Sequence, residues 1–238
     1  MKVGVDAVIL GAWVNVTGKH KVMDVGCGCG VISLMVAQRN PQAVIHAIDI
    51  DEESVAEAME NFTNSPWSSN LTAVCANFMD LERTGGISGG IGQNKGDVTS
   101  IYTDRKYDLI VSNPPYFDSG VSEIETRRER ARHQGELSPY TILTIGKSVL
   151  QPDGVVAMVI PFEQKEDLIA FATSNGYFLQ RELVVRGREG KQPKRSFMEF
   201  KWGIDKTDTV CEEMSIETSE GEYTIAYHDL CRDFYLKF

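Results

Sequence analysis

The sequence predicts an α/β fold, in which an open, mostly parallel seven-stranded sheet ends in an antiparallel C-terminal hairpin and carries helices on both faces. Two observations support this prediction. Short apolar runs alternate with longer helix-like segments along most of the chain, which is the pattern of strand–helix–strand crossovers. Glycine clusters, prolines and acidic residues stand where these strands and helices would begin or end.

The first half of the chain is expected to contain three helices and four strands. The apolar runs assigned to strands span only four to six residues, which favours strands over helices. The helix that begins at Asp51 has acids crowding its first turn, as the helix dipole favours. In order, the expected elements are a helix at Asp6–Trp13, a strand at Val22–Val25, a helix at Val31–Arg39, a strand at Val44–Ile48, a helix at Asp51–Asn61, and strands at Leu71–Ala76 and Tyr107–Ser112.

The second half supplies the remaining elements. We expect a helix at Ser138–Val149, a strand at Val155–Ile160, a helix at Glu163–Asn175, hairpin strands at Phe178–Val185 and Phe197–Trp202, and a weak helix at Ile225–Phe234. Between the halves, residues 84–96 hold six glycines in thirteen positions without apolar periodicity. That composition predicts a flexible surface insertion at about residues 84–103.

The composition limits the class of protein. With 42% hydrophobic and 24% charged residues in 238 positions, the chain is expected to form one domain with a sizeable core. No apolar stretch approaches the ~20 residues of a membrane span, and no secretory signal is expected at the start. The five cysteines are odd in number and irregularly spaced, which favours reduced thiols and a cytoplasmic location. No spacing predicts a metal site.

Basic residues gather in two islands on an acidic chain. The net charge of −10 argues against indiscriminate binding to nucleic acid. Residues 127–132 nevertheless hold four arginines against one glutamate, a net charge of +3. Residues 181–201 hold seven cations and three anions, a net charge of +4. The two islands indicate a focused site for a polyanion, with solvated loops as the alternative.

A glycine-rich turn follows the first strand. It places Asp24 at the strand end and then the glycines Gly26, Gly28 and Gly30. A dinucleotide fingerprint would run Gly-x-Gly-x-x-Gly, and a leading carboxylate is a poor neighbour for a pyrophosphate but a good one for a cationic methionine moiety. Asp49 at the end of the second strand is placed to accept hydrogen bonds from ribose hydroxyls. Asp51 could compete for that role, although a helix N-cap role is favoured.

Asn77 and Phe78 follow the third strand. Asn77 is a candidate to hydrogen-bond the edge of an adenine and Phe78 to stack on its face, although Phe78 could equally be a core residue. Because the carboxyl ends of parallel strands share one edge of a sheet, these residues should line one crevice with Asp24, the glycines and Asp49.

The tetrapeptide Asn113-Pro114-Pro115-Tyr116 ends the fourth strand. Two prolines cannot continue a sheet ladder, so they form a stiff corner there. The corner presents an amide side chain, a carbonyl without a ladder partner and an aromatic face. This set suits a planar substrate that carries an amino group.

Together these features resemble the class I methyltransferases that use S-adenosylmethionine, whose sheet is Rossmann-like. The NPPY segment is similar to that of enzymes that methylate planar amino nitrogens. The resemblance implies that the Asn113 side-chain oxygen and the Pro114 carbonyl accept the two N–H bonds of the target, which directs the nitrogen lone pair toward the methyl group. Tyr116 would stack on the base, with Pro115 and Phe117 beside it. A target inside a nucleic acid must first be unstacked.

Further segments resemble the bacterial methyltransferases of adenine 37 in valine tRNA. They are the opening segment 1–13, Ala131-Arg132, Pro193-Lys194-Arg195, and the closing residues Tyr223 and 233–238. There are departures: Val5 stands where the family usually has Thr, a lead-in before Met1 is missing, and the glycine-rich insertion is extra. The first two bear on the wall of the substrate site.

The resemblance implies a cofactor half at about residues 1–112 and a substrate half at about 113–238. Asp6 would lie near the cofactor or the target base, or serve as an N-cap. A set of cations would hold the phosphates of the tRNA anticodon stem-loop: Arg130, Arg132, Arg186, Arg188, Lys194 and Arg195. We expect a monomer.

Two other functions remain open. A methyltransferase that acts on a glutamine side chain of a protein would share the NPPY corner, but it needs no basic hairpin. A module that binds the cofactor and RNA without catalysis would not need Asn113 and Tyr116. A DNA adenine methyltransferase normally carries a further recognition domain of about 100 residues, for which this chain has no room.

Overall fold

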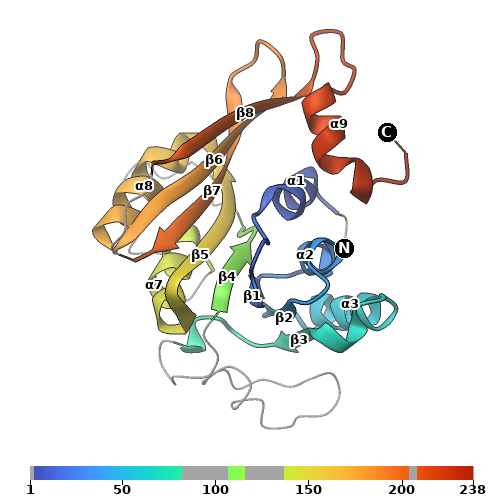
Figure 1. Cartoon of the computed structure of the whole chain (residues 1–238), viewed down its shortest axis with the longest axis vertical. Coiled ribbons are helices and arrows are strands. Elements are labelled where there is room, and N and C mark those ends of the chain that lie inside the picture. Colours follow the sequence, from blue (N-terminus) through green and yellow to red (C-terminus); the bar gives the residue numbers. More distant parts are fainter. Residues whose placement is uncertain (1–2, 82–106, 116–136, 204–207, 238) are drawn as a thin grey trace.

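The computed structural model describes residues 3–81, 107–115, 137–203 and 208–237. Its strands form one sheet in the order β3-β2-β1-β4-β5-β7-β6-β8, with helices on both faces (Figure 1). The predicted α/β class, the mostly parallel sheet and the antiparallel hairpin are confirmed. The sheet has eight strands rather than the seven expected, because β8 was not predicted. The glycine-rich insertion lies outside the described residues.

The first half of the chain contributes the following elements: α1 (Val5–Trp13), β1 (Lys21–Val25), α2 (Val31–Arg39), β2 (Val44–Asp49), α3 (Glu52–Thr63), the 3₁₀ turn η1 (Ser68–Asn70), β3 (Leu71–Cys75) and β4 (Tyr107–Ser112). The second half contributes α7 (Pro139–Val149), β5 (Leu150–Pro161), η2 (Phe162–Gln164), α8 (Lys165–Ser174), β6 (Tyr177–Arg188), β7 (Pro193–Trp202), β8 (Val210–Glu217), α9 (Ile225–Cys231) and η3 (Arg232–Phe234). The predicted elements that fall on described residues are all present, with ends shifted by a few residues.

The order of the strands reverses between β1 and β4. From β1 the chain moves outward through β2 to β3, and it then returns to place β4 on the other side of β1. The strands β1 to β5 are parallel, so their carboxyl ends share one edge of the sheet, called here the carboxyl edge. In open sheets of this kind, ligands bind outside the carboxyl ends at the point of reversal.

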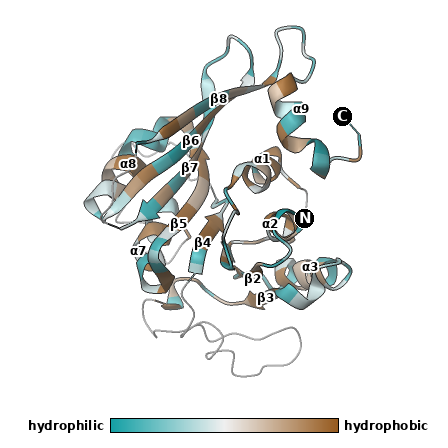
Figure 2. Cartoon of the chain, in the orientation of Figure 1, coloured by the Kyte–Doolittle hydropathy of each residue, from teal (hydrophilic) through white to brown (hydrophobic). Residues whose placement is uncertain are grey.

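Two apolar cores lie on the two faces of the sheet. Side chains from α1, α2, α3 and α9 pack on one face, and side chains from α7 and α8 pack on the other. Successive residues of a strand alternate between the faces: Val22 and Leu109 belong to the first core, Met23 and Ile110 to the second. In Figure 2 the central strands and α1 are mostly hydrophobic, as elements covered on both sides should be.

Strand β8 pairs in parallel with β6 at one border of the sheet. Only Met214 of its eight residues is buried, so the segment lacks the apolar run by which the other strands were predicted. Its acids form ion pairs with arginines of β6. Glu212 also accepts a 3.0 Å hydrogen bond from the indole N–H of Trp13 in α1. The Arg181 guanidinium lies over the ring of the same tryptophan, 4.5 Å from its centroid. Polar contacts thus fix this strand where burial is slight.

Candidate active site

The candidate site lies at the carboxyl edge, where β1 and β4 adjoin. The glycine-rich turn follows β1 and the Asn-Pro-Pro corner follows β4. The register that pairs Asp24 with Val111 brings these two loops side by side. Ser112 ties them together, because its buried hydroxyl donates a 2.7 Å hydrogen bond to the carbonyl of Val25. Sequence reasoning missed Ser112, since a serine at a strand end gives no signal of its partner.

The turn after β1 requires its glycines. Gly26, Gly28 and Gly30 have φ values of 72°, 54° and 80°, in the left-handed region that side chains disfavour. The Gly26 N–H donates to the carbonyl of Ile48 at 2.8 Å, and the Gly28 N–H donates to Asp49 Oδ2 at 2.9 Å. These bonds hold the turn against the end of β2, and the turn leads directly into the first N–H groups of α2.

Replacing Gly30 should destabilise the protein strongly. A Cβ there would lie 2.5 Å from a ring carbon of the buried Phe62, in addition to the strain of a φ of 80°. We expect Gly30→Ala to lower the free energy of unfolding by about 2–4 kcal/mol. Gly18→Ala is the matched control, since Gly18 has a φ of 69° but nothing within 4 Å of its Cβ. It should cost only about 1 kcal/mol. Equal losses in urea unfolding would contradict the steric argument.

Asp24 is fully buried behind the turn. Its Oδ2 accepts hydrogen bonds from the Ser33 N–H at 3.1 Å and the Ser33 hydroxyl at 2.7 Å. Among the described residues, no donor reaches the buried Oδ1. Burial raises the pKa of Asp24 to about 7, against the lowering effect of the two bonds from Ser33, and the nearby Asp49 charge adds to the rise. A buried carboxylate oxygen that lacks a partner is suited to a cationic ligand.

Asp49 and Asp51 make different hydrogen bonds. Asp49 is half-buried at the end of β2, and its oxygens accept from the N–H groups of Gly28 and Asp51. Asp51 caps α3: its Oδ2 accepts from the N–H of Ser54 at 2.9 Å and from the Ser54 hydroxyl at 2.6 Å. These bonds lower the pKa of Asp51. The preferred N-cap role of Asp51 is confirmed.

Asn77 and Phe78 follow β3 as predicted, but they differ in exposure. Asn77 is half-buried and its side-chain oxygen accepts from the N–H of Met79 at 3.0 Å, which leaves its amide nitrogen out of that bond. Phe78 is only 4% exposed and packs in the core under α7, the alternative left open for it. Ile50, which sequence reasoning missed, is 69% exposed directly after Asp49.

The three described residues of the corner after β4 differ in solvent exposure. Asn113 is half-buried, Pro114 is buried and Pro115 is exposed. The other predicted residues of this region, Tyr116, Phe117, Arg130 and Arg132, lie outside the described residues.

Asp6 and Arg195 meet at the carboxyl edge. The Nε of Arg195 donates to Asp6 Oδ2 at 2.8 Å, and β7 places Arg195 opposite Pro161, the last residue of β5. Asp6 lies within the first turn of α1, whose N-cap is Gly4, so the N-cap role considered for Asp6 is wrong. Two residues predicted separately for the substrate side thus form one ion pair.

The other hairpin arginines are paired with β8. Arg186 lies 2.8 Å from Glu213 and Arg188 lies 2.7 Å from Glu217. Residues 210–222 contain five glutamates and no lysine or arginine, a net charge of −5 against the +4 of residues 181–201. The second basic island is therefore largely neutralised. Within the described residues, no carboxylate pairs with Lys191 or Lys194.

The comparisons with known proteins agree with this geometry. The profile of the family described as "Methyltransferase small domain" matches residues 8–169. The tRNA1(Val) (adenine(37)-N6)-methyltransferase of Bacteroides fragilis is 36% identical over 237 residues, which cover 100% of this chain and 92% of that protein. The chain belongs to this methyltransferase family. The family member of Tolumonas auensis is 33% identical over 238 residues, with 100% and 91% of the two chains covered.

Solved structures of methyltransferases share the fold of the family. The crystal structure of "a predicted O-methyltransferase" from Agrobacterium tumefaciens has a TM-score of 0.65 and 15% identity, and 96% of each chain is covered. A methyltransferase from Pyrococcus furiosus has a TM-score of 0.53 and 21% identity, with 83% and 81% covered. At these identities the likeness concerns the fold alone. The predictions of the family and of a methyl-transferring enzyme are confirmed by the family match.

The described residues give no sign of a membrane-spanning helix or of a metal-binding cluster. No helix in this part of the chain is long and apolar enough to cross a membrane. The same residues contain no group of three or more His, Cys, Asp or Glu side chains that could hold a metal ion.

Proposed function

We propose that this protein transfers a methyl group from S-adenosylmethionine to the exocyclic amine of an adenine in tRNA, the adenine 3′ of the anticodon of valine tRNA. The observation that supports this most is the junction of β1 and β4. There the turn backed by the buried Asp24 adjoins the Asn-Pro-Pro corner, at the point where the strand order reverses. The family members of Bacteroides fragilis and Tolumonas auensis are named for the same reaction.

The residues around the turn fit S-adenosylmethionine. The unpartnered Oδ1 of Asp24 suits the cationic methionine part, and positive-φ glycines allow the backbone to approach a ligand closely. Asp49 is proposed for the ribose hydroxyls and Asn77 for the adenine edge. Ile50, rather than the buried Phe78, offers an exposed apolar side chain for the adenine face. When bound, this cofactor supplies a methyl group on a positively charged sulfur.

The corner after β4 is proposed to bind the target amine. The Asn113 side-chain oxygen and the Pro114 carbonyl would accept its two N–H bonds, and this would draw the nitrogen lone pair out of conjugation with the ring. Pro114 is buried, which fixes the position of its carbonyl, while Tyr116 and Phe117 are proposed to flank the base. Positioning and electrostatics then provide the catalysis, without a strong general base.

Contact with RNA phosphates is proposed for the basic residues predicted from the sequence. Their contributions to tRNA affinity are expected to differ, because some of them already pair with carboxylates. Arg186, Arg188 and Arg195 would have to share or exchange their carboxylate partners, whereas Lys194 has no such partner among the residues that the structure describes. We therefore expect Lys194→Ala to weaken tRNA binding more than Arg188→Ala. Lys194→Ala should also lower the slope of log affinity against log salt by about 0.7–0.9. Equal effects of the two substitutions on the salt dependence would contradict this ranking.

One observation keeps a second candidate function open. The acids of β8 offset the basic hairpin, which was the feature that favoured RNA over a glutamine side chain of a protein. The Asn-Pro-Pro corner would serve an amide substrate equally well, because a glutamine amide is also planar and conjugated.

The first experiment separates these functions. The purified protein is incubated with labelled S-adenosylmethionine and either unmodified bulk tRNA or a release-factor protein, and the products are analysed by mass. We expect label in adenosine that carries a methylated exocyclic amine. Label in glutamine alone would overturn the proposal. The predicted cytoplasmic location is part of this proposal, since a tRNA substrate would be found there.

A further inference from the structure

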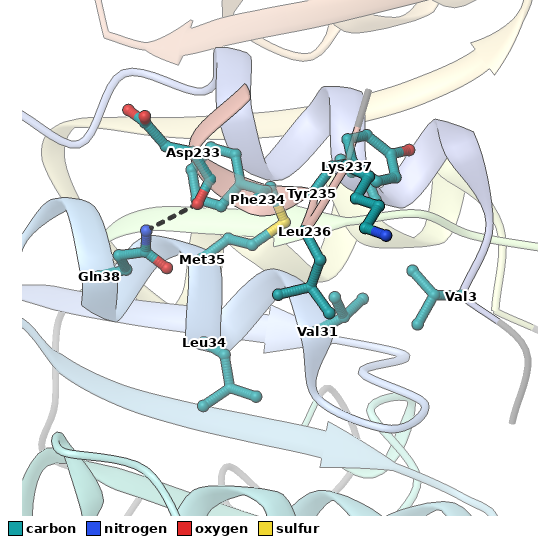
Figure 3. A pocket seen from close by; sticks show the side chains of 11 residues that line it. Val3, Val31, Leu34, Met35, Gln38, Asp233, Phe234, Tyr235, Leu236 and Lys237 are labelled. Carbon is teal, nitrogen blue, oxygen red and sulfur yellow. Dashed lines mark hydrogen bonds between the residues drawn. The ribbon is translucent and has the colours of Figure 1, made fainter. Parts of the chain in front are cut away.

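An apolar groove of about 640 Å³ runs along α2, between this helix, the start of α1 and the C-terminal residues 233–237 (Figure 3). The floor and walls include Val8 of α1, Val31 and Leu34 of α2, and Phe234 and Leu236 of the C-terminal segment. The segment is fastened in place, because Gln38 Nε2 donates to the carbonyl of Asp233 at 3.1 Å. The hydroxyl groups of Tyr227 and Tyr235, 3.0 Å apart, add a second contact between this segment and α9.

The groove opens next to the candidate active site. Val31 is the first residue of α2 and directly follows Gly30 of the glycine-rich turn. Figure 3 shows the bond between Gln38 and Asp233 at one end of the groove and Val3 with Lys237 at the other. Val3 stands just before α1, whose first turn holds Asp6 against Arg195 at the carboxyl edge. A chain that enters the site across this edge would pass the groove.

The open end of the groove combines apolar surface with a cation. Leu236 is 104% exposed and Val3 is 48% exposed. Lys237 has no carboxylate partner among the described residues, in contrast to the arginines of the hairpin. Apolar side chains beside an available cation suit the face of a nucleobase with its phosphate, since bases stack on apolar and aromatic surfaces and lysine binds phosphate as a point charge.

We propose that this groove binds an unstacked nucleotide that neighbours the target adenine in the RNA substrate. The base lies against Leu236 and the apolar lining, and its phosphate contacts Lys237. The inference rests on the proposed function and adds a contact outside the glycine-rich turn and the Asn-Pro-Pro corner. A groove of this size is within the common range of about 300–1,000 Å³ for sites that bind small molecules of nucleotide size.

A second copy of the chain fits less well. A two-fold dimer centred on the groove would bring both copies of Lys237 into one interface, so that interface would contain two positive charges. An RNA strand brings the opposite charge to the same place.

The test uses two variants at exposed positions, Leu236→Ser and Lys237→Ala, which should not disturb folding. Lys21→Ala is the matched control, because Lys21 is exposed at the start of β1, at the opposite edge of the sheet. The wild-type enzyme is first shown to methylate tRNA, so a failure of the proposed function appears before any variant is made. Affinity for S-adenosylmethionine, kcat and KM for tRNA, and the sedimentation coefficient are then measured for each protein.

We expect each groove variant to raise KM for tRNA about 3–10-fold, with cofactor affinity and kcat unchanged. Lys237→Ala should also reduce the salt slope of tRNA binding by about 0.7–0.9, and Lys21→Ala should change neither quantity. An unchanged KM in an active enzyme would overturn the inference. A wild-type dimer that Leu236→Ser dissociates, with KM unaltered, would assign the groove to contact between copies instead.

Discussion

Asn113→Ala is expected to abolish turnover while leaving cofactor affinity intact. The substitution removes the side-chain oxygen proposed to accept one N–H of the target amine, so the nitrogen lone pair stays conjugated with the ring. Loss of one positioned polar group of this kind typically costs about 10²–10³-fold in kcat. We expect kcat to fall by at least that factor, since no second side chain of the described site can take the place of the amide.

The matched control is Asn64→Ala, because Asn64 is an exposed asparagine at the C-terminal end of α3. Single-turnover methylation of tRNA and calorimetric titration with S-adenosylmethionine separate the two effects. Asn113 is half-buried and Pro114 keeps the backbone corner rigid, so cofactor affinity should change less than about threefold. Turnover of Asn113→Ala within tenfold of the wild type would refute the acceptor role of Asn113. A parallel loss of cofactor affinity would mean that the corner supports the cofactor instead.

The sequence predicted the part of the fold that is built from apolar runs. Strands β1, β2 and β4 are short hydrophobic segments covered on both faces, and hydrophobicity identifies such strands directly. Hydrophobicity does not identify strand β8, because only one of its eight residues is buried and three of them are glutamates. What fixes β8 is its pairing with arginines on β6, and long-range ion pairs leave no periodic signal in a sequence.

The same limit applies to the candidate site. Residues of the glycine-rich turn and the Asn-Pro-Pro corner could be predicted because glycine and proline reveal the backbone conformation they require. The role of Arg195 could not, because its contact with Asp6 joins residues 189 positions apart. Phe78 shows the converse limit: the sequence left stacking on adenine and a place in the core equally open, and its 4% exposure under α7 follows from packing that no local pattern reveals.

Charge counted along the chain describes only part of the electrostatics of the hairpin. The +4 of residues 181–201 is real, but the structure lays a segment of charge −5 beside it. The electrostatic potential at the surface of the hairpin depends on both residues 181–201 and residues 210–222. A basic run therefore predicts a polyanion site only when its neighbours in space, and not merely in sequence, are known.

Asp24→Asn should stabilise the cofactor-free protein and at the same time destroy its affinity for S-adenosylmethionine. Burial raises the pKa of Asp24 from 3.8 to about 7, so the folded state holds the proton more tightly than the unfolded chain. The stability that this residue contributes is complete below about pH 4 and is lost as the pH rises through 7. Above pH 7 the folded protein contains a buried charge, and one of its oxygens has no partner in the described part of the chain.

Asparagine removes the buried charge and keeps the local bonds, because its side-chain oxygen can still accept from the N–H and the hydroxyl of Ser33. Its amide nitrogen takes the place of Oδ1, and burial of these N–H donors offsets part of the gain. A shift of about three pKa units corresponds to roughly 4 kcal/mol at pH 8, an upper bound that relaxation of the site reduces. We therefore expect Asp24→Asn to be more stable than the wild type at pH 8 by up to this amount. The two proteins should be nearly equal at pH 4, as measured by urea unfolding.

Cofactor affinity should change in the opposite direction. The ionised carboxylate favours a cationic ligand, so wild-type affinity for S-adenosylmethionine is expected to fall as the pH drops below 7. The Asp24→Asn protein should bind at least 100-fold more weakly at pH 8 and should lack this pH dependence between pH 6 and 8. Ser33→Ala, which deletes only the hydroxyl that donates to Oδ2, is the control that alters the same cluster while keeping the charge.

A stabilised Asp24→Asn protein with full cofactor affinity would mean that the buried charge serves neither folding nor the cofactor. A destabilised variant would mean that the carboxylate is satisfied in solution. Only the combination of higher stability and lost affinity fits a residue kept at a cost to folding because it holds the ligand.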